Sequence, residues 1–168
     1  MIRLLSWNTK DPNTAGLCRL ADAFGVERIA FVRKPKSWAA AVGTQGHTPC
    51  EFPDDPYALL ERWIAEGYPA VAVEQADEAQ MLGTCPLPQF ATFVLGNEGP
   101  GVPKAVLARA HTIVEIPQWG PCCSLNVATA GAIVLYEWAT QHCATWPRSQ
   151  NAWKKRHGLG RNPREASA

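Results

Sequence analysis

Short apolar segments alternate with helical patterns along most of this 168-residue chain, and this alternation limits the possible folds. Most of the apolar segments lack the polar alternation of a half-exposed strand, which is typical of strands buried on both faces. The sequence therefore predicts an α/β fold with a parallel sheet and helices on both faces. The expected strands are Ile2–Trp7, Arg28–Val32, an edge strand Cys50–Phe52, Ala70–Glu74, Ala91–Leu95 and His111–Ile116.

The helical segments carry recognisable start and stop signals. A helix over Ala15–Phe24 is expected to begin at Asn13 or Thr14 as the cap and to stop at Gly25. The next helix begins at Asp55 and Pro56 and stops at Gly67. A short helix is expected over Pro103–Ala110, and a long one from Ser124 to Cys143 in which Ser124 and Asn126 occupy the cap and first turn.

Composition excludes several classes of protein. No apolar run approaches the roughly 18 residues of a membrane span. The six cysteines form no CxxC pair and the four histidines have no HExxH spacing, so we predict reduced cysteines and no metal site. The first ten residues turn polar too early for a secretory signal, which predicts a cytoplasmic protein.

Charge is unevenly distributed although the formal net charge is only +1. From Arg148 onward the chain has six basic residues and one acidic residue. We therefore expect a domain over residues 1–147 and a basic, flexible tail over 148–168. A basic tail indicates a polyanionic partner, and the alternative is a solvated tail that maintains solubility.

Glycine-rich loops follow two of the later strands, Gly96–Gly101 (GNEGPG) and Pro117–Cys123 (PQWGPCC). Ligands of parallel sheets bind beyond the carboxyl ends of the strands, so these loops indicate a site in the carboxyl-terminal half. The first strand is not followed by GxGxxG, and GxxxxGK[ST] is absent from the sequence. Their absence argues against a dinucleotide fingerprint and a P-loop.

Three segments together resemble the SpoU/TrmH branch of the SPOUT RNA ribose methyltransferases. They are NTAGLCRLADAFG (Asn13–Gly25), LGNEGPGVP (Leu95–Pro103) and IPQWGPCCSLNVATAGAIVLYE (Ile116–Glu137). With NTAGLCR, the stretch GYPAVAVEQA is most similar to eukaryotic enzymes that methylate the conserved guanosine of the tRNA D-loop. The resemblance implies a deep trefoil knot at the carboxyl end, bound S-adenosylmethionine and an obligate homodimer.

The resemblance also implies which residues act at the site. The catalytic set is Asn13, Arg19, Glu98, Ser124 and Asn126. A guanidinium stays protonated, so we expect Arg19 to orient the ribose hydroxyl or a nearby phosphate and to stabilise negative charge; its ordinary alternative is an ion pair with Asp22. The implied cofactor-binding residues are Leu95, Gly96, Asn97, Gly99, Ile116, Pro117, Gly120, Ser124 and Leu125.

Two details complete the functional prediction. Relatives have glycine two residues after the asparagine, where this chain has Ala15 followed by Gly16. Phosphates need cations, and the candidates for RNA binding are Arg33, Lys34, Lys36, Lys154, Lys155 and Arg156.

We therefore expect a homodimeric RNA 2′-O-ribose methyltransferase that uses S-adenosylmethionine and favours tRNA. The alternatives are a non-catalytic RNA-binding module with the same fold, a base-directed methyltransferase, ribosomal RNA as substrate, and an unrelated nucleotide-binding enzyme.

Overall fold

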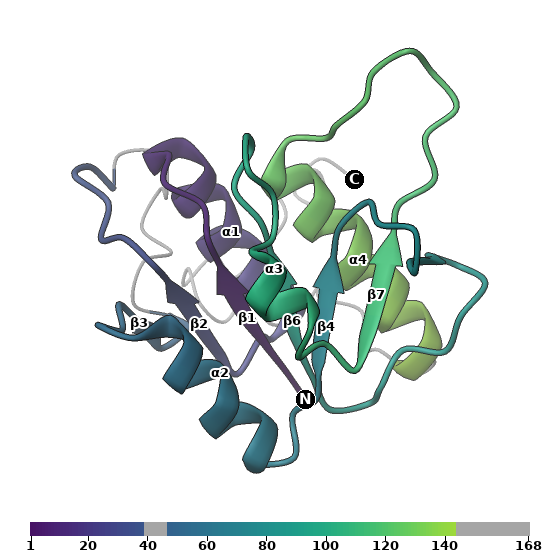
Figure 1. The fold of residues 1–168 in the computed structure, drawn as a ribbon. Helices are drawn as coiled ribbons and strands as arrows, with labels where there is room; N and C mark the ends of the chain where they lie inside the picture. Colours follow the sequence, from purple (N-terminus) through teal and green to yellow (C-terminus); the bar gives the residue numbers. More distant parts are fainter. Residues whose placement is uncertain (39–46, 144–168) are drawn as a thin grey trace, which may run out of the picture.

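A computed structural model describes residues 1–38 and 47–143 of the chain. Within these ranges seven parallel strands form one sheet with the order β3-β2-β1-β6-β4-β7-β5 (Figure 1). The predicted parallel sheet is confirmed. The strands are β1 Ile2–Ser6, β2 Arg28–Phe31, β3 Cys50–Glu51, β4 Ala70–Val73, β5 Gln80–Met81, β6 Ala91–Leu95 and β7 Thr112–Glu115.

Helices cover both faces of the sheet, as the sequence predicts. Helices α1 (Asp11–Phe24) and α4 (Val127–His142) pack on one face, and α2 (Pro56–Ala65) and α3 (Lys104–Leu107) on the other (Figure 1). Each face has its own apolar cluster, with Phe31 and Phe93 buried on the first and Leu60 and Trp63 on the second. The continuous burial of β1 and β6 follows from their place between these two layers.

Helix α1 begins earlier than the sequence predicts. Its first residue is Asp11, and the N-cap residue Lys10 makes no side-chain cap bond, so the predicted capping by Asn13 or Thr14 is wrong. N–H groups in the first turn of a helix have no acceptor within the helix, so a proline, which lacks this group, is tolerated there. Pro12 is therefore compatible with a helix that begins at Asp11. The stop at Gly25 is confirmed, with φ 66° in the left-handed region.

The other helices show where capping signals succeed. Asp55 caps α2 by accepting from the backbone N–H groups of Tyr57 and Ala58 at 2.9 and 3.0 Å, as predicted. Helix α4 begins at Val127 instead of Ser124, because the Asn126 side chain takes the cap position and accepts from Ala128 and Thr129. Helix α3 has only four residues and is shorter than predicted.

Strand register brings three loops to one edge of the sheet. Ser6 of β1 and Val73 of β4 both pair with Leu95, the last residue of β6. The segments after β1, β4 and β6 therefore begin level with one another at the edge formed by the carboxyl ends of the strands, which we call the carboxyl edge. The sequence missed β5, whose two exposed residues have no apolar pattern and pair only with β7.

Candidate active site at the carboxyl edge

A cavity of about 270 Å³ opens at the carboxyl edge. Its walls come from the ends of β4 and β6, the loop 96–103, the loop 116–126 and the first turn of α4. Loop 116–126 stands out from the body of the protein and returns to α4 (Figure 1). The lining residues are Val73, Glu74, Gln75, Leu95, Gly96, Asn97, Glu98, Gly99, Gly101, Ile116, Gln118, Cys123, Ser124, Leu125, Val127 and Ala130.

Most residues predicted to bind a cofactor line this cavity. The exceptions are Pro117 and Gly120, which do not border it. A Cβ atom at Gly120 would meet nothing within 4 Å, so this glycine lies in open surroundings. The sequence signal was the glycine-rich loop itself, and it could not tell which of the loop residues face inward.

The loop after β6 is closed tightly upon itself. The backbone groups of Asn97 and Gly101 form two hydrogen bonds, of 3.0 and 2.9 Å. A Cβ at Gly96 would lie 2.4 Å from the Gly101 carbonyl carbon, so a side chain there is incompatible with this closure. Close approach of the chain to itself therefore requires Gly96. A Cβ at Gly99 would meet nothing within 4 Å, so the packing described here does not require that glycine.

Glu74 holds the same loop from the neighbouring strand. Its Oε2 accepts from the Val102 backbone N–H at 2.6 Å, and Oε1 accepts from the Gln75 N–H at 3.0 Å. Gly101 has φ 69°, and a Cβ there would lie 2.3 Å from Glu74 Oε2. Sequence reasoning missed Glu74 and Gln75 as site residues, although Glu74 is the last residue of the predicted strand Ala70–Glu74 and Gln75 directly follows it.

A polar cluster at the mouth of the cavity joins three distant segments. Asn13 from α1 donates to Glu98 Oε1 at 2.7 Å, and Asn126 donates to Asn13 Oδ1 at 2.9 Å and to Glu98 Oε1 at 3.3 Å. The Lys10 ammonium pairs with the other carboxylate oxygen of Glu98. An ionised carboxylate only accepts hydrogen bonds, so donors from both ends of the chain converge on a group suited to them.

The turn before α1 fixes the backbone from which Lys10 and Asn13 extend. The Asn8 side chain accepts from the Lys10 N–H at 3.0 Å and from Asn13 Nδ2 at 3.3 Å. It also donates to the Lys10 carbonyl and to the Thr14 hydroxyl, each at 2.9 Å. Asn8 is buried, so this turn is held by an amide that sequence reasoning did not single out.

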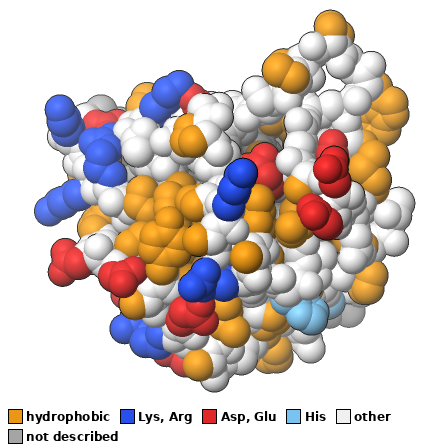
Figure 2. Space-filling model, viewed as in Figure 1, with side chains coloured by type: hydrophobic (Ala, Val, Ile, Leu, Met, Phe, Trp, Pro, Cys, Tyr) orange, Lys and Arg blue, Asp and Glu red, His pale blue; other side chains and the backbone are white. Residues whose placement is uncertain are grey.

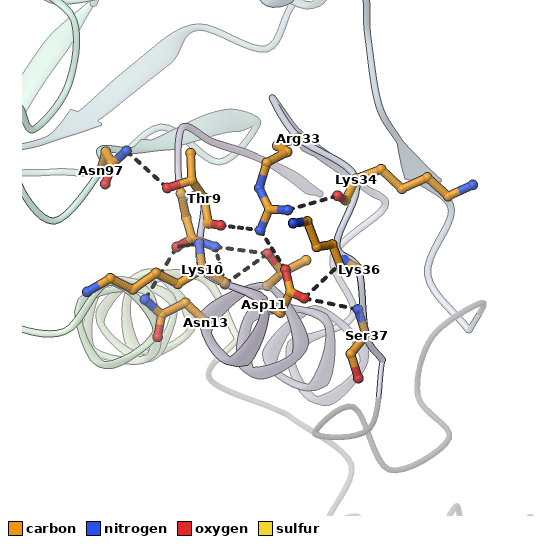
Figure 3. A network of polar contacts seen from close by, with 11 residues as sticks. Thr9, Lys10, Asp11, Asn13, Arg33, Lys34, Lys36, Ser37 and Asn97 are labelled. Carbon is orange, nitrogen blue, oxygen red and sulfur yellow. Dashed lines mark hydrogen bonds and ion pairs between the residues drawn. The ribbon is translucent and has the colours of Figure 1, made fainter.

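Arg33, a predicted RNA-binding residue, forms contacts within the protein. It donates to the Asp11 carboxylate at 2.5 Å and to the backbone carbonyls of Thr9 and Lys34 (Figure 3). The Arg33 bond is the main reason why the pKa of Asp11 lies below its ordinary value. Arg33 thus ties the segment after β2 to α1. Lys34 and Lys36 are exposed, and Lys154, Lys155 and Arg156 lie outside the described residues.

Two predicted catalytic residues stand apart from the cluster. Arg19 is exposed on α1, does not line the cavity, and follows Asn13 by six residues, which turns it by roughly 120° on the helix. Ser124 lines the cavity, and its carbonyl accepts from the Cys122 thiol at 3.1 Å. Neither side chain has a hydrogen bond to Glu98 among the described contacts.

Two tryptophans near the site differ in exposure. Trp38 packs edge-on against Phe52 and the core. Trp119 in the protruding loop is 93% exposed, and sequence reasoning did not separate it from the other tryptophans. In the described parts of the chain, His, Cys, Asp and Glu side chains form no group that could hold a metal ion. No helix of these parts is long and apolar enough to cross a membrane.

Comparison of the sequence with known proteins shows to which family the chain is related. The model of the SpoU rRNA Methylase family matches residues 1–136. The chain is 30% identical over 141 residues to the Saccharomyces cerevisiae tRNA (guanosine(18)-2′-O)-methyltransferase, covering 79% of this chain but only 10% of that protein. It therefore spans a small part of this much longer relative.

Two solved structures share the fold. The A. aeolicus TrmH/SpoU tRNA modifying enzyme has a TM-score of 0.76 and 26% identity, over 83% of this chain and 74% of that one. The SpoU methyltransferase AviRb from Streptomyces viridochromogenes, solved in complex with AdoMet, has a TM-score of 0.69 and 26% identity, over 84% and 60% of the two chains. With the family model matched over most of its length, this chain belongs to the SpoU rRNA Methylase family.

Proposed function

We propose that the protein transfers a methyl group from S-adenosylmethionine to a ribose 2′-oxygen of RNA, with tRNA as the favoured substrate. The observation that carries the proposal is the Glu98–Asn13–Asn126 cluster at the mouth of a cavity lined by the family's glycine-rich loops. The yeast relative is named for this reaction on tRNA, which supports the choice of substrate.

The cavity has the composition that the cofactor requires. Leu95, Ile116 and Leu125 offer apolar walls for an adenine ring, while the backbone of loops 96–103 and 116–126 offers donors and acceptors. Bound S-adenosylmethionine would supply an electrophilic sulfonium methyl group at the mouth. Asn13 and Asn126 would fix the Glu98 carboxylate beside the reacting groups.

RNA would approach across the exposed face beside the cavity. Figure 2 shows Lys and Arg side chains gathered along the side of the molecule that carries β2. Lys34 and Lys36 belong to the segment that Arg33 and Asp11 hold in place, so their charges are presented from a fixed backbone. We propose that these lysines and the tail 148–168, which lies outside the described residues, contact phosphates.

We further propose a homodimer. Ile133 and Tyr136 of α4 are exposed apolar side chains that a partner can cover. Arg19 does not line the cavity of its own chain, and in the proposed dimer it acts on the ribose bound at the cavity of the second subunit. Sedimentation that finds only an 18.3 kDa species at micromolar concentration would contradict the dimer.

Two finer features complete the proposal. Membership of the family supports our proposal of a trefoil knot in the carboxyl-terminal half. An experimental structure in which the chain is not threaded through a loop of its own backbone would contradict the knot. The cysteines of the described residues are all unpaired, which suits a reducing compartment, and we propose a cytoplasmic location. Detection of the tagged full-length protein outside the cytoplasm would refute that location.

The decisive experiment uses purified protein, methyl-labelled S-adenosylmethionine, and unmodified tRNA beside ribosomal RNA. We expect label on the 2′-oxygen of one tRNA nucleoside, with Arg19→Ala abolishing it while cofactor affinity is kept. Label on a base would support the base-directed alternative. Cofactor binding without label in either RNA would support a non-catalytic module.

A further inference from the structure

A second, more open hollow adjoins the cavity next to the start of α1. It is lined by Lys10, Asn97, Glu98, Gly99, Ser124, Leu125 and Asn126, and all of these except Lys10 and Asn126 also line the cavity. The carboxylate of Glu98 and the ammonium of Lys10 are the only charged groups of this hollow among the described residues. The hollow and the cavity therefore meet at the loops that carry Glu98 and Ser124.

Lys10 combines a fixed backbone with a side chain that is open to solvent. Its N–H donates to Asn8, and its carbonyl accepts from the N–H groups of Asn13 and Thr14, both at 3.1 Å. The side chain is nevertheless 63% exposed and reaches away from the Arg33–Asp11 pair (Figure 3). The ammonium of Lys10 therefore lies at the end of a solvent-exposed side chain whose backbone is held by hydrogen bonds.

The ammonium of Lys10 retains donors for a substrate. It has three N–H groups, and its single partner in the described structure is Glu98. Glu98 in turn is held by Asn13 and Asn126, and its side chain is only 24% exposed. The ion pair therefore positions the ammonium beside Glu98, where hollow and cavity meet, and its other N–H groups have no partner among the described residues.

No other cation of the described chain occupies this place. Arg19 lines neither hollow nor cavity, and Arg33 is engaged with Asp11 and two carbonyls. The reaction needs positive charge here, because a hydroxyl that attacks an electrophilic carbon develops negative charge as its proton leaves. Within one subunit Lys10 is the cation that can meet this charge, in addition to the Arg19 that we propose a second subunit supplies.

We propose that Lys10 is a further catalytic residue, whose ammonium group contacts the target ribose 2′-oxygen and stabilises its developing negative charge. The inference rests on the function proposed above. In the step, the 2′-oxygen bonds to the methyl carbon, the carbon–sulfur bond breaks with its electron pair going to sulfur, and the hydroxyl proton passes to water. Lys10 stays protonated throughout and donates a hydrogen bond.

The test compares Lys10→Met, which keeps the stem but removes the charge, with Lys10→Arg, which keeps the charge. Single-turnover methylation at saturating RNA and cofactor should fall at least about 100-fold in Lys10→Met. Lys10→Arg should recover the rate to within about tenfold of wild type. Lys104→Met, at an exposed lysine away from the cavity, is the matched control and should retain the wild-type rate.

Two further readouts separate this role from a structural one. Cofactor affinity by calorimetry and the KM for RNA should change less than about threefold in Lys10→Met, while its rate should keep rising with pH where the wild-type rate has levelled. If Lys10→Met does not fold, Lys10→Gln replaces it.

A rate within about threefold of wild type, or a loss confined to the KM for RNA, would overturn the inference alone. A wild-type protein that labels no ribose would overturn the proposed function instead, so the two failures are distinguishable.

Discussion

The amino edge of the sheet, where its strands begin, and the carboxyl edge each carry a cluster of charged side chains. The two clusters differ in how far their charged groups are exposed to water. At the amino edge, Arg3 pairs with Glu27 at 3.1 Å and Glu66 at 2.5 Å, and its guanidinium carbon lies 3.7 Å from the centre of the Tyr68 ring. The Arg3 side chain is only 6% exposed. At the carboxyl edge, Lys10, Glu98, Asn13 and Asn126 meet beside a cavity.

The difference lies in what each charge has as a neighbour. Burial lowers the pKa of Arg3, but its hydrogen bonds to Glu66 and Glu27 outweigh this effect and hold that pKa above its ordinary value. The Tyr68 hydroxyl donates to Glu27 and, together with Arg3, keeps the pKa of Glu27 low. The terminal nitrogens of Arg3 are therefore paired with two carboxylates, and only its buried Nε has no hydrogen-bond partner in the described structure, whereas the exposed Lys10 ammonium has N–H groups to offer to a ligand.

The largest expected effect is a loss of activity at the carboxyl edge. Glu98→Gln keeps the size of the side chain but removes the charge that pairs with Lys10, so methylation should slow at least about 100-fold, or roughly 2.7 kcal/mol. The free energy of unfolding should change by less than about 1 kcal/mol, because the side chain is partly solvated. Rapid-quench kinetics measures the methylation rate, and urea unfolding measures the stability. A loss of unfolding free energy as large as the loss of activity would contradict the proposed difference between the two edges.

Arg3→Met should show the opposite pattern. The methionine keeps contact with Tyr68 and Trp63 but leaves two carboxylates without their shared cation, so we expect a loss of about 2 kcal/mol in unfolding free energy. Methylation per folded molecule should stay within about twofold of wild type, because Arg3 is at the opposite edge from the cavity. Unfolding in urea and activity at a temperature well below the melting point test this, and unchanged stability would contradict it.

Gly96→Ala should weaken cofactor binding. The added methyl group would collide with the Gly101 backbone, so loop 96–103 must open, and we expect about a tenfold loss of S-adenosylmethionine affinity, near 1.4 kcal/mol. Gly120→Ala is the matched comparison, since its methyl group would meet open space and should leave the melting temperature unchanged. Calorimetry measures the affinity, and equal affinities for Gly96→Ala and wild type would show that the loop closure does not shape the pocket.

The smallest expected effect concerns the stability of the protein at acidic pH. The pKa of Glu27 in the folded protein is lowered from 4.5 by the hydrogen bond from Tyr68, with Arg3 adding to it. A lowered pKa contributes stability that is present above the unfolded value and is lost as the pH falls through the folded value. The stability difference between wild type and Glu27→Gln, expected to be below about 1 kcal/mol, should therefore shrink as the pH falls below about 4.5. A difference that grows in acid would contradict this pairing.

The glycine-rich loops show which structural features the local sequence pattern predicts and which it does not. The apolar run before Gly96 and the glycines after it predicted a buried strand entering a tight loop, and both are present. The sequence could not say why Gly96 is needed, because the colliding atom belongs to Gly101, which approaches only when the loop closes. It likewise could not place Gly120 outside the cavity, since local composition does not tell which way a loop residue faces.

The amino-acid sequence alone determined the alternation of buried strands and helices, the cap at Asp55, and the glycine that ends α1. These features depend on neighbours within a few residues, where side-chain type and backbone preference act directly. Only the tertiary structure decided that Asn13 and Asn126, 113 residues apart, share the Glu98 carboxylate. It also placed Lys10 at the cavity mouth and left Arg19 away from it, because the register of β1, β6 and β4 sets which distant loops meet at one edge.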